Sequence, residues 1–147
     1  MSATFHGRDI FSPAAAHLAL GLDPGELGGP VEPDSLVRLA YPEPEIGSRR
    51  IRARCLYVDR FGNIQLNLSA RDVEPLGIVP GRRVEVELPV DRFYAIAART
   101  FADARAGDII LYEDAYQNIA IAISRGNAAQ TFGVRAGTEV RLRADSE

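Results

Sequence analysis

Residues 50–68, which read RIRARCLYVDRFGNIQLNL, decide the fold. In the first half of this stretch, apolar residues alternate with charged ones and share one face: Ile51, Ala53, Cys55 and Tyr57. The second half alternates again and brings together Ile64, Leu66 and Leu68. Alternation with a period of two is typical of a strand with one buried face. The stretch therefore predicts two strands, residues 50–58 and 63–68, joined by a short loop.

More segments with the same character follow, which makes about seven short strands in all. They are residues 83–88, 92–99, 109–113, 118–123 and 138–143. Glycine turns separate them, and residues 127–132 could form a short helix. Many short strands with such turns favour a small barrel or sandwich. We therefore expect a mainly β chain, with a small β-barrel-like C-terminal domain preceded by one short helix and a Pro/Gly-rich linker.

An internal repeat runs through this β region. Residues 59–69 match residues 114–124 at an offset of 55, and both copies carry an aspartate, an aromatic residue, an asparagine, three aliphatic residues and a serine. After a one-residue indel, residues 77–86 match residues 133–142. The repeat predicts two pseudo-equivalent β-units with their D-x-[FY]-x-N loops at related places. Two copies of so long a period do not make a solenoid.

In front of the β region we expect one short helix, with Ser12 as N-cap, Pro13 at the first helical position and Gly21 at its end. So short a helix is not stable by itself, and its surface of alanine and leucine therefore needs a partner. Residues 22–48 are rich in proline and glycine and are interpreted as an extended linker. The expected packing anchors of this linker are Leu36, Val37 and Leu39. The expected divisions of the chain are residues 1–21, 22–48 and 49–147.

The composition of the chain excludes several kinds of functional site. The chain has 147 residues, a formal net charge of −3, one cysteine and no lysine. These counts exclude an intrachain disulfide, a zinc site made of cysteines, a lysine Schiff base and a Walker-type phosphate site, and we expect no metal site. The acidic balance argues against a nucleic-acid partner. No apolar run approaches the roughly 20 residues that cross a membrane, and the N-terminus is unlike a signal peptide, so we expect a cytoplasmic protein without a membrane partner.

The loop at residues 59–63 contains side chains that could bind a ligand. Asn63 could read the edge of a base, Phe61 could stack on a flat ring, and Asp59 could bind an ammonium or a hydroxyl group. The alternative is an ordinary hairpin turn, because Asp, Gly and Asn are common turn residues. The recurrence of the pattern at Asp114, Tyr116 and Asn118 fits both interpretations.

Two further stretches could carry chemistry. Residues 124–129 end a strand and open a helix, where free backbone N–H groups can bind anions or ring nitrogens; the alternative is a simple turn with Asn127 as N-cap. Near the N-terminus, His6, Arg8 and Asp9 lie within four residues and could form a catalytic cluster. The alternative there is an exposed histidine without a role.

Three of these motifs together resemble a known family. FHGRDIFSPAAAHLA at residues 5–19, DRFGNIQLNL at 59–68 and ISRGNAA at 123–129 are similar to the S-adenosylmethionine hydrolases, also called SAM hydroxide adenosyltransferases, which are related to fluorinase and chlorinase. The resemblance implies an N-terminal α/β domain and a C-terminal β-barrel-like domain. It also implies trimers whose active site lies between one subunit's N-domain and its neighbour's C-domain. Residues 1–21 then match the tail of the N-domain, and residues 49–147 match the C-domain.

The resemblance also implies a reaction. Water displaces methionine from the ribose C5′ carbon of S-adenosylmethionine, without a cofactor, and gives adenosine and methionine. His6 matches the histidine of an Asp-Arg-His set that holds the water, which favours the hydroxide branch. The other two members of the set match the missing part of the N-domain, so we expect this chain alone to be inactive.

The family's ligand contacts match particular residues. Asp59 matches the contact to the methionine amino group, Phe61 the aromatic residue near adenine, and Asn63 the amide that reads adenine. The matches in the later motifs are Tyr116, Arg125, Asn127 and Ala128. The family's N-S-x-G sequence, which holds the methionine end, has no serine here, because the region reads Asp114-Ala115-Tyr116-Gln117-Asn118.

The expected partners are therefore S-adenosylmethionine or adenosine and an N-terminal domain of the same family, within a homo-oligomer. The alternatives are a nucleoside-binding module without catalysis and a domain that serves trimer assembly.

Overall fold

The computed structural model describes residues 2–38 and 41–144. The chain forms two compact units, Met1–Ala40 and Tyr41–Glu147. The predicted divisions after residues 21 and 48 stay predictions.

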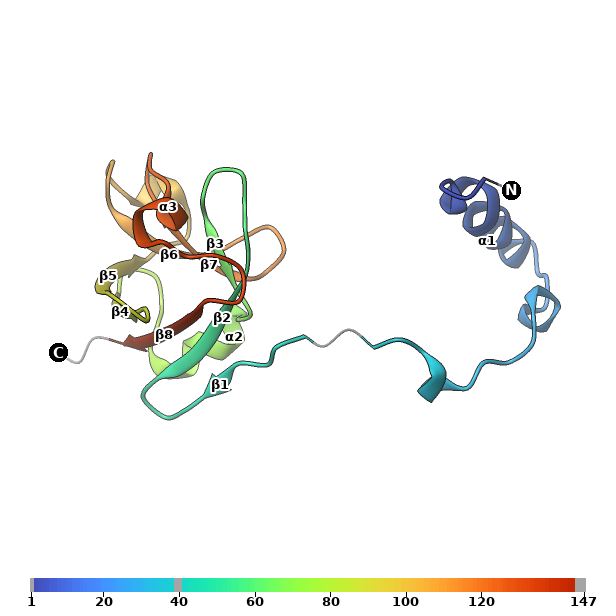
Figure 1. Ribbon diagram of the computed structural model, residues 1–147, viewed down its shortest axis with the longest axis horizontal. Coiled ribbons are helices and arrows are strands. Elements are labelled where there is room, and N and C mark those ends of the chain that lie inside the picture. Colours follow the sequence, from blue (N-terminus) through green and yellow to red (C-terminus); the bar gives the residue numbers. More distant parts are fainter. Residues whose placement is uncertain (1, 39–40, 145–147) are drawn as a thin grey trace. The chain divides into compact units, whose positions relative to one another are not determined.

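The C-terminal unit is a closed β-barrel (Figure 1). Its strands are β1 (Glu45–Ile46), β2 (Ile51–Val58), β3 (Ile64–Leu66), β4 (Arg83–Glu87), β5 (Arg92–Ala97), β6 (Ile109–Glu113), β7 (Ile119–Ile123) and β8 (Glu139–Ala144). Its α-helices are α2 (Ala70–Val73) and α3 (Ala128–Phe132). The strand order is β1-β2-β3-β7-β6-β5-β4-β8, and pairing of β2 with β8 closes the ring. The seven predicted strands are the seven that form the barrel, so the predicted fold class is confirmed.

The strand β1 is an addition to this barrel. It is two residues long and pairs antiparallel with the first residues of β2. Two residues are too few to show an alternating pattern, which is why this strand was not predicted. It lies within the stretch interpreted as linker.

The internal repeat corresponds to a local two-fold arrangement. The succession β2, β3, α2, β4 recurs as β6, β7, α3, β8. Where β3 meets β7, Gln65 pairs with Ala120, its own equivalent in the second copy. Where β4 meets β8, Val86 pairs with its equivalent Leu142. The strand β5 has no copy and pairs parallel with β6. The barrel is therefore two related units plus one inserted strand.

The barrel core consists of the inward residues of these strands. The strand β2 alternates as expected up to Cys55, with Ile51, Ala53 and Cys55 at most 2% exposed. A register shift then separates Cys55, opposite Leu66, from Tyr57, opposite Gln65. This bulge turns Tyr57 away from the core and leaves it 38% exposed. The prediction that Tyr57 shares the buried face is therefore wrong.

The N-terminal unit is mostly helical at its start. A π-helical turn, Gly7–Phe11, runs directly into α1 (Ser12–Ala19). Ser12 is therefore not the N-cap: it has helical dihedral angles, and its Oγ donates a hydrogen bond to the Gly7 carbonyl over 2.8 Å. Gly21, with a φ of 95°, lies in the left-handed region just after the helix, where it was predicted to end. Neither helical segment has a buried residue.

The rest of the N-terminal unit contains two short 3₁₀ turns, Pro24–Leu27 and Pro33–Ser35. Leu36 is 61% exposed and Val37 is 95% exposed, so these two residues do not anchor the segment. The third expected anchor, Leu39, lies outside the described residues.

Candidate functional site

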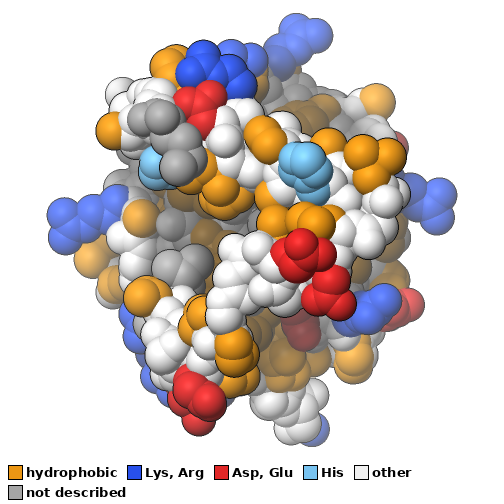
Figure 2. Space-filling model, turned by 90° about the vertical axis from the view of Figure 1, so that its right-hand side faces the viewer, with side chains coloured by type: hydrophobic (Ala, Val, Ile, Leu, Met, Phe, Trp, Pro, Cys, Tyr) orange, Lys and Arg blue, Asp and Glu red, His pale blue; other side chains and the backbone are white. Residues whose placement is uncertain are grey.

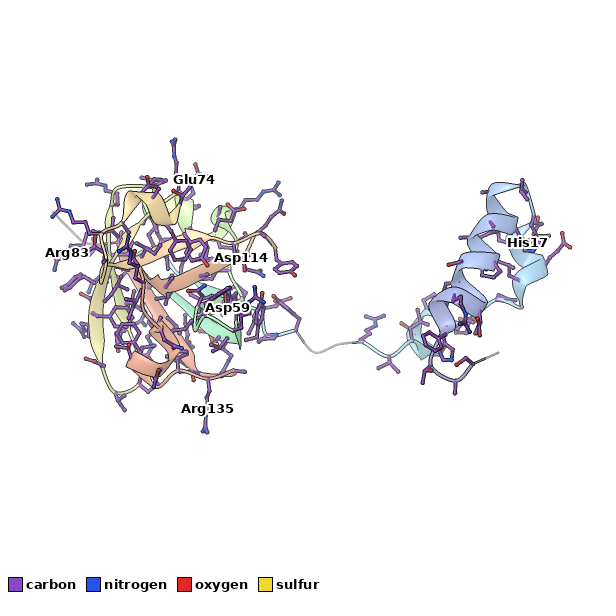
Figure 3. All side chains as sticks on the ribbon, turned by 90° about the horizontal axis from the view of Figure 1, so that it is seen from above. His17, Asp59, Glu74, Arg83, Asp114 and Arg135 are labelled. Carbon is purple, nitrogen blue, oxygen red and sulfur yellow. The ribbon has the colours of Figure 1, made fainter. Side chains whose placement is uncertain are left out.

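A pocket of about 1180 Å³ opens beside the two repeated loops, residues 59–63 and 114–118. Aromatic side chains supply much of its wall: Tyr41, Tyr57, Phe61, Phe101, Tyr112 and Tyr116. Two carboxylates from the loops, Asp59 and Asp114, also line it, and Figure 3 labels both on one side of the barrel. Aromatic faces attract flat rings and cations, and carboxylates attract cations. The pocket therefore suits a ligand with an aromatic ring and a positive charge.

The first loop is a turn organised by Asp59. Its Oδ1 accepts hydrogen bonds from the backbone N–H groups of Phe61, over 2.8 Å, and Asn63, over 2.9 Å. Its Oδ2 accepts one from Asn63 Nδ2 over 2.8 Å. Burial acts to raise the pKa of the Asp59 carboxyl, but the hydrogen bonds from Asn63 and Phe61 outweigh it and lower this pKa. The geometry is that of the hairpin turn considered as the alternative.

Side chains of the first loop differ in exposure. Asn63 is only 7% exposed, and its amide nitrogen is engaged with Asp59. Phe61 is 62% exposed and lines the pocket, with the Arg60 guanidinium 4.7 Å from its ring centroid. The phenyl ring is therefore available for stacking, whereas Asn63 is mainly part of the turn.

The second loop has the same backbone and a different use of its side chains. Asp114 Oδ1 accepts from the N–H groups of Tyr116, over 2.8 Å, and Asn118, over 2.9 Å. Asp114 Oδ2, however, is buried and has no partner among the described residues. The side-chain amide of Asn118, which lines the pocket, makes no hydrogen bond within residues 41–144. Tyr116 is 78% exposed at the tip.

A tyrosine precedes each loop and lines the pocket. Burial raises the pKa of Tyr112 to about 12, and the negative charges of Asp59 and Asp114 add to the effect. Burial and then the charge of Asp114 also raise the pKa of Tyr57. Because the charges of both carboxylates act on the pKa of each tyrosine, the two loops form one electrostatic environment. Sequence reasoning missed both tyrosines as pocket residues, although their equal distance from the two repeated aspartates was a usable signal.

Gln65, which is 3% exposed, follows the first loop and also lines the pocket. With its amide nitrogen facing the carbonyl oxygens of Tyr57, at 3.1 Å, and Asn63, at 2.8 Å, both contacts are hydrogen bonds. Gln65 therefore ties the end of β2 to the end of the first loop.

The third motif, residues 123–129, contacts the first loop. Asn127 Oδ1 accepts from Gln130 N over 2.7 Å and caps α3, as the alternative interpretation expected. The Ala129 N–H donates to the Gly62 carbonyl over 2.9 Å. Ala128 is fully buried, so its side chain faces the core. Arg125 is exposed and has a φ of 59°.

The N-terminal candidates lie in the other unit. His6 is exposed, and both histidines of the chain appear at the surface in Figure 2. Arg8 Nε and Asp9 Oδ1 pair over 2.6 Å, and Asp9 Oδ2 accepts from Ser2 N over 2.8 Å. Neither contact includes His6, so within residues 2–38 the histidine does not join the Arg8–Asp9 pair.

The structure thus gathers Asp59, Phe61 and Tyr116 around one pocket, with Asn63 buried within the first loop and Asn127 beside Gly62 of that loop. Their roles as ligand contacts stay predictions. Within residues 2–38 and 41–144, no three His, Cys, Asp or Glu side chains are grouped so as to hold a metal ion. No helix in the described part of the chain is long and apolar enough to cross a bilayer.

Comparisons with known proteins give the family. The model of the SAM hydroxide adenosyltransferase C-terminal domain matches residues 53–141. A relative named (R)-S-adenosyl-L-methionine hydrolase, from Salinispora tropica, is 40% identical over 98% of this chain and 52% of its own length. A fluorinase from an Actinoplanes strain is 31% identical over 95% of this chain and 48% of its own.

A solved structure of an uncharacterized conserved protein from Thermotoga maritima has a TM-score of 0.80 and 31% identity, covering 97% of this chain and 54% of that one. The chain spans about half the length of the curated relatives it matches.

Proposed function

The chain belongs to the SAM hydroxide adenosyltransferase C-terminal domain family, and we propose that its barrel supplies the adenosyl-binding half of a site that hydrolyses S-adenosylmethionine. The observation that carries the proposal is the pocket between the repeated loops, with aromatic walls and two carboxylates. S-Adenosylmethionine has an aromatic base, a sulfonium cation and an ammonium group, and each matches a feature of this pocket.

The proposed roles follow from the chemistry of the side chains. Phe61 stacks on adenine, because it is exposed on the pocket wall and base–aromatic stacking is worth about 1–3 kcal/mol. Asp59 attracts the cationic end of the ligand. Asn63 contributes from the first loop and Asn127 from beside Gly62. Arg125 and Ala128 contribute from the segment around the start of α3, and Tyr116 contributes from the second loop. Of these, Asn63 acts mainly by holding Asp59 in place.

The proposed reaction needs little chemical assistance from the protein. The water oxygen forms a bond to C5′, the C5′–sulfur bond breaks, and its electron pair stays on sulfur as neutral methionine. The water gives up one proton. A sulfonium leaves without being protonated, so the protein's contribution is to orient water and ligand in line and to exclude other solvent. In this proposal His6 holds the water, and a neighbouring N-terminal domain of the family completes the site in a homo-oligomer.

The proposal is tested by calorimetric titration of the 147-residue chain with adenosine. We expect Phe61→Ala to weaken adenosine binding about 5- to 100-fold, because it removes a stacking surface. Phe61 is preferred to Asn63 for this test, because it is exposed and not part of the turn. The control is Tyr94→Ala, which removes an exposed aromatic ring that does not line the pocket.

An unchanged affinity in Phe61→Ala, or an equal loss in the control, would contradict the assigned site. If adenosine does not bind the wild-type chain, the barrel does not hold the adenosyl group by itself, and the assembly role becomes the better account.

A further inference from the structure

The segment that enters the barrel is held by a buried side chain. Asn67 follows β3 and is only 4% exposed. Its amide nitrogen donates a hydrogen bond to the Pro42 carbonyl over 2.6 Å, and its amide oxygen accepts one from the Arg54 N–H over 2.6 Å. The Asn67 amide therefore joins the residues before β1 to the strand β2.

The internal repeat shows that the core accepts an apolar side chain at this position. At the offset of 55, the equivalent of Asn67 is Ala122, which is fully buried and packs with Ala98 and Ile110. Burying an amide in place of a methyl group costs free energy unless the amide is hydrogen-bonded. The presence of Asn67 in the first copy is therefore explained by the segment that it holds.

The same segment is fixed again a few residues later. The strand β1 pairs with the start of β2 (Figure 1), and the Arg52 guanidinium pairs with the Glu45 carboxylate. On the other side of the anchored residue, Tyr41 directly precedes Pro42. A residue before proline is largely restricted to extended backbone conformations. Holding Pro42 therefore also limits where Tyr41 can lie.

Tyr41 is the one pocket residue that comes from the stretch interpreted as linker, among the described residues that line the pocket. The other aromatic residues of the pocket belong to the barrel strands and to the loops that join them. Tyr41 is 59% exposed, and its hydroxyl makes no hydrogen bond within residues 41–144. Its ring is therefore positioned by the backbone next to it and is available to a ligand.

We propose that Asn67 is a positioning residue for the pocket: by holding Pro42, it keeps the Tyr41 ring on the pocket wall, where the ring contacts the base of the bound nucleoside. The contact with the base rests on the proposed function, whereas the anchoring of Tyr41 does not. A ring that is held in place before binding loses less conformational entropy when the ligand arrives, which favours affinity.

The anchoring is tested by fluorescence, without a ligand. The chain has no tryptophan, so Tyr41→Trp introduces a single fluorescent reporter on the pocket wall. We expect Asn67→Ala in this background to shift the emission to longer wavelength and to increase its quenching by acrylamide, because the released ring becomes more exposed to water. An unchanged emission would overturn the inference.

The matched control places the reporter elsewhere. Tyr94→Trp lies on β5 outside the pocket, and its emission should not respond to Asn67→Ala. An equal shift in both reporters would mean that Asn67→Ala unfolds the barrel. Pro42→Gly then replaces it, because this substitution frees the backbone of Tyr41 and leaves the buried Asn67 unchanged. The same shift is expected at Tyr41→Trp alone, and its absence would overturn the inference.

The contact with the base is tested by calorimetric titration of the full chain with adenosine. We expect Tyr41→Ala to weaken binding by about 5-fold or more, because it removes an aromatic surface. Asn67→Ala should weaken binding about 3- to 10-fold when Tyr41 is present and less than about 2-fold in the Tyr41→Ala background, because its effect passes through that ring.

An equal loss from Asn67→Ala in both backgrounds would mean that Asn67 supports the pocket as a whole, and it would overturn the inference. So would an unchanged affinity in Tyr41→Ala. If the wild-type chain does not bind adenosine, the proposed function fails together with the contact to the base. The emission of the Tyr41→Trp reporter then decides the anchoring by itself.

Discussion

The first and second loops of the repeat share a backbone and differ in what holds their side chains. Residues 59–63 use both carboxylate oxygens of Asp59 within the turn, and the Gly62 carbonyl accepts a hydrogen bond from the Ala129 N–H of α3. Residues 114–118 make the same turn with one carboxylate oxygen and leave the other unused. One copy therefore uses both carboxylate oxygens of its aspartate within the turn, and the other uses one.

This difference shows how a duplicated element can divide two tasks. A turn needs only one oxygen of its aspartate, so the second oxygen can be used for further fixation or for recognition. In the barrel the bonded and the unbonded oxygen belong to two aspartates that line one pocket. If the first loop is the more rigid copy, a substitution there should lower stability more than its counterpart in the second loop.

The largest effect is expected from Gly62→Ala. An added Cβ would lie 2.1 Å from Asn127 Oδ1, and Gly62 has a φ of 86°. The Asn127 side chain cannot give way freely, because it caps α3. The left-handed backbone and the lost cap should together lower the free energy of unfolding by about 2–3 kcal/mol, measured by urea denaturation.

The second loop provides the control for this substitution. Gln117 occupies the equivalent position with a φ of 65°, so a side chain is already tolerated there. Gln117→Gly should change the free energy of unfolding by less than about 1 kcal/mol. Equal effects in the two loops would contradict the idea that only the first is locked against α3.

The fold could be predicted from the sequence to a large extent, because barrel strands alternate between core and solvent. The repeat also predicted correctly that the two aspartate loops are equivalent. The failures have local causes. A bulge after Cys55 adds a residue that the alternation of apolar and polar residues does not reveal, and Tyr57 therefore faces the pocket. At the N-terminus, helical backbone before Ser12 displaced the predicted cap.

The site was harder to predict for a different reason. By residue type alone, Asn63 and Asn118 are equally able to bind a ligand, and the sequences around the two turns are alike. What separates them is contact with distant parts of the chain, such as the start of α3 against the first loop. Such contacts depend on the closed barrel, which single motifs do not encode.

A smaller effect is expected when the aspartates are compared directly. In Asp59→Asn an amide nitrogen would replace an oxygen that accepts a hydrogen bond, and the free energy of unfolding should fall by about 1–3 kcal/mol near pH 6. Asp114→Asn loses no partner at Oδ2 and should stay within about 0.5 kcal/mol of wild type. Parallel urea titrations of the two variants measure this difference.

The pH dependence of the free energy of unfolding tests whether the ionised Asp59 carboxylate causes this difference. The folded state lowers the pKa of Asp59 below its ordinary value of 3.8, so the unfolded state binds the proton first. The contribution of Asp59 is therefore present above that ordinary value and is lost as the pH falls through the folded pKa. The gap between wild type and Asp59→Asn should narrow toward about pH 3. A gap that stays constant would assign the loss to packing.

The smallest effect concerns the tyrosines that precede the two loops, and it appears only at alkaline pH. Burial, with the charges of Asp59 and Asp114, raises the pKa of Tyr112 from 10.0 to about 12. Because the unfolded chain loses this proton first, the stability that depends on the neutral tyrosine is present below pH 10 and is lost as the pH rises toward 12.

Tyr112→Phe should flatten that alkaline decline and leave stability near neutral pH within about 0.5 kcal/mol, and the tyrosinate absorbance of the wild type should show one group ionising last. Tyr57→Phe is the matched variant at the first loop. Tyr57 lies on an outward bulge, so it should account for less of the decline. If Tyr57→Phe and Tyr112→Phe flattened the alkaline decline equally, the two carboxylates would act equally on both rings. The difference between the loops would then be confined to the side chains of the loops themselves.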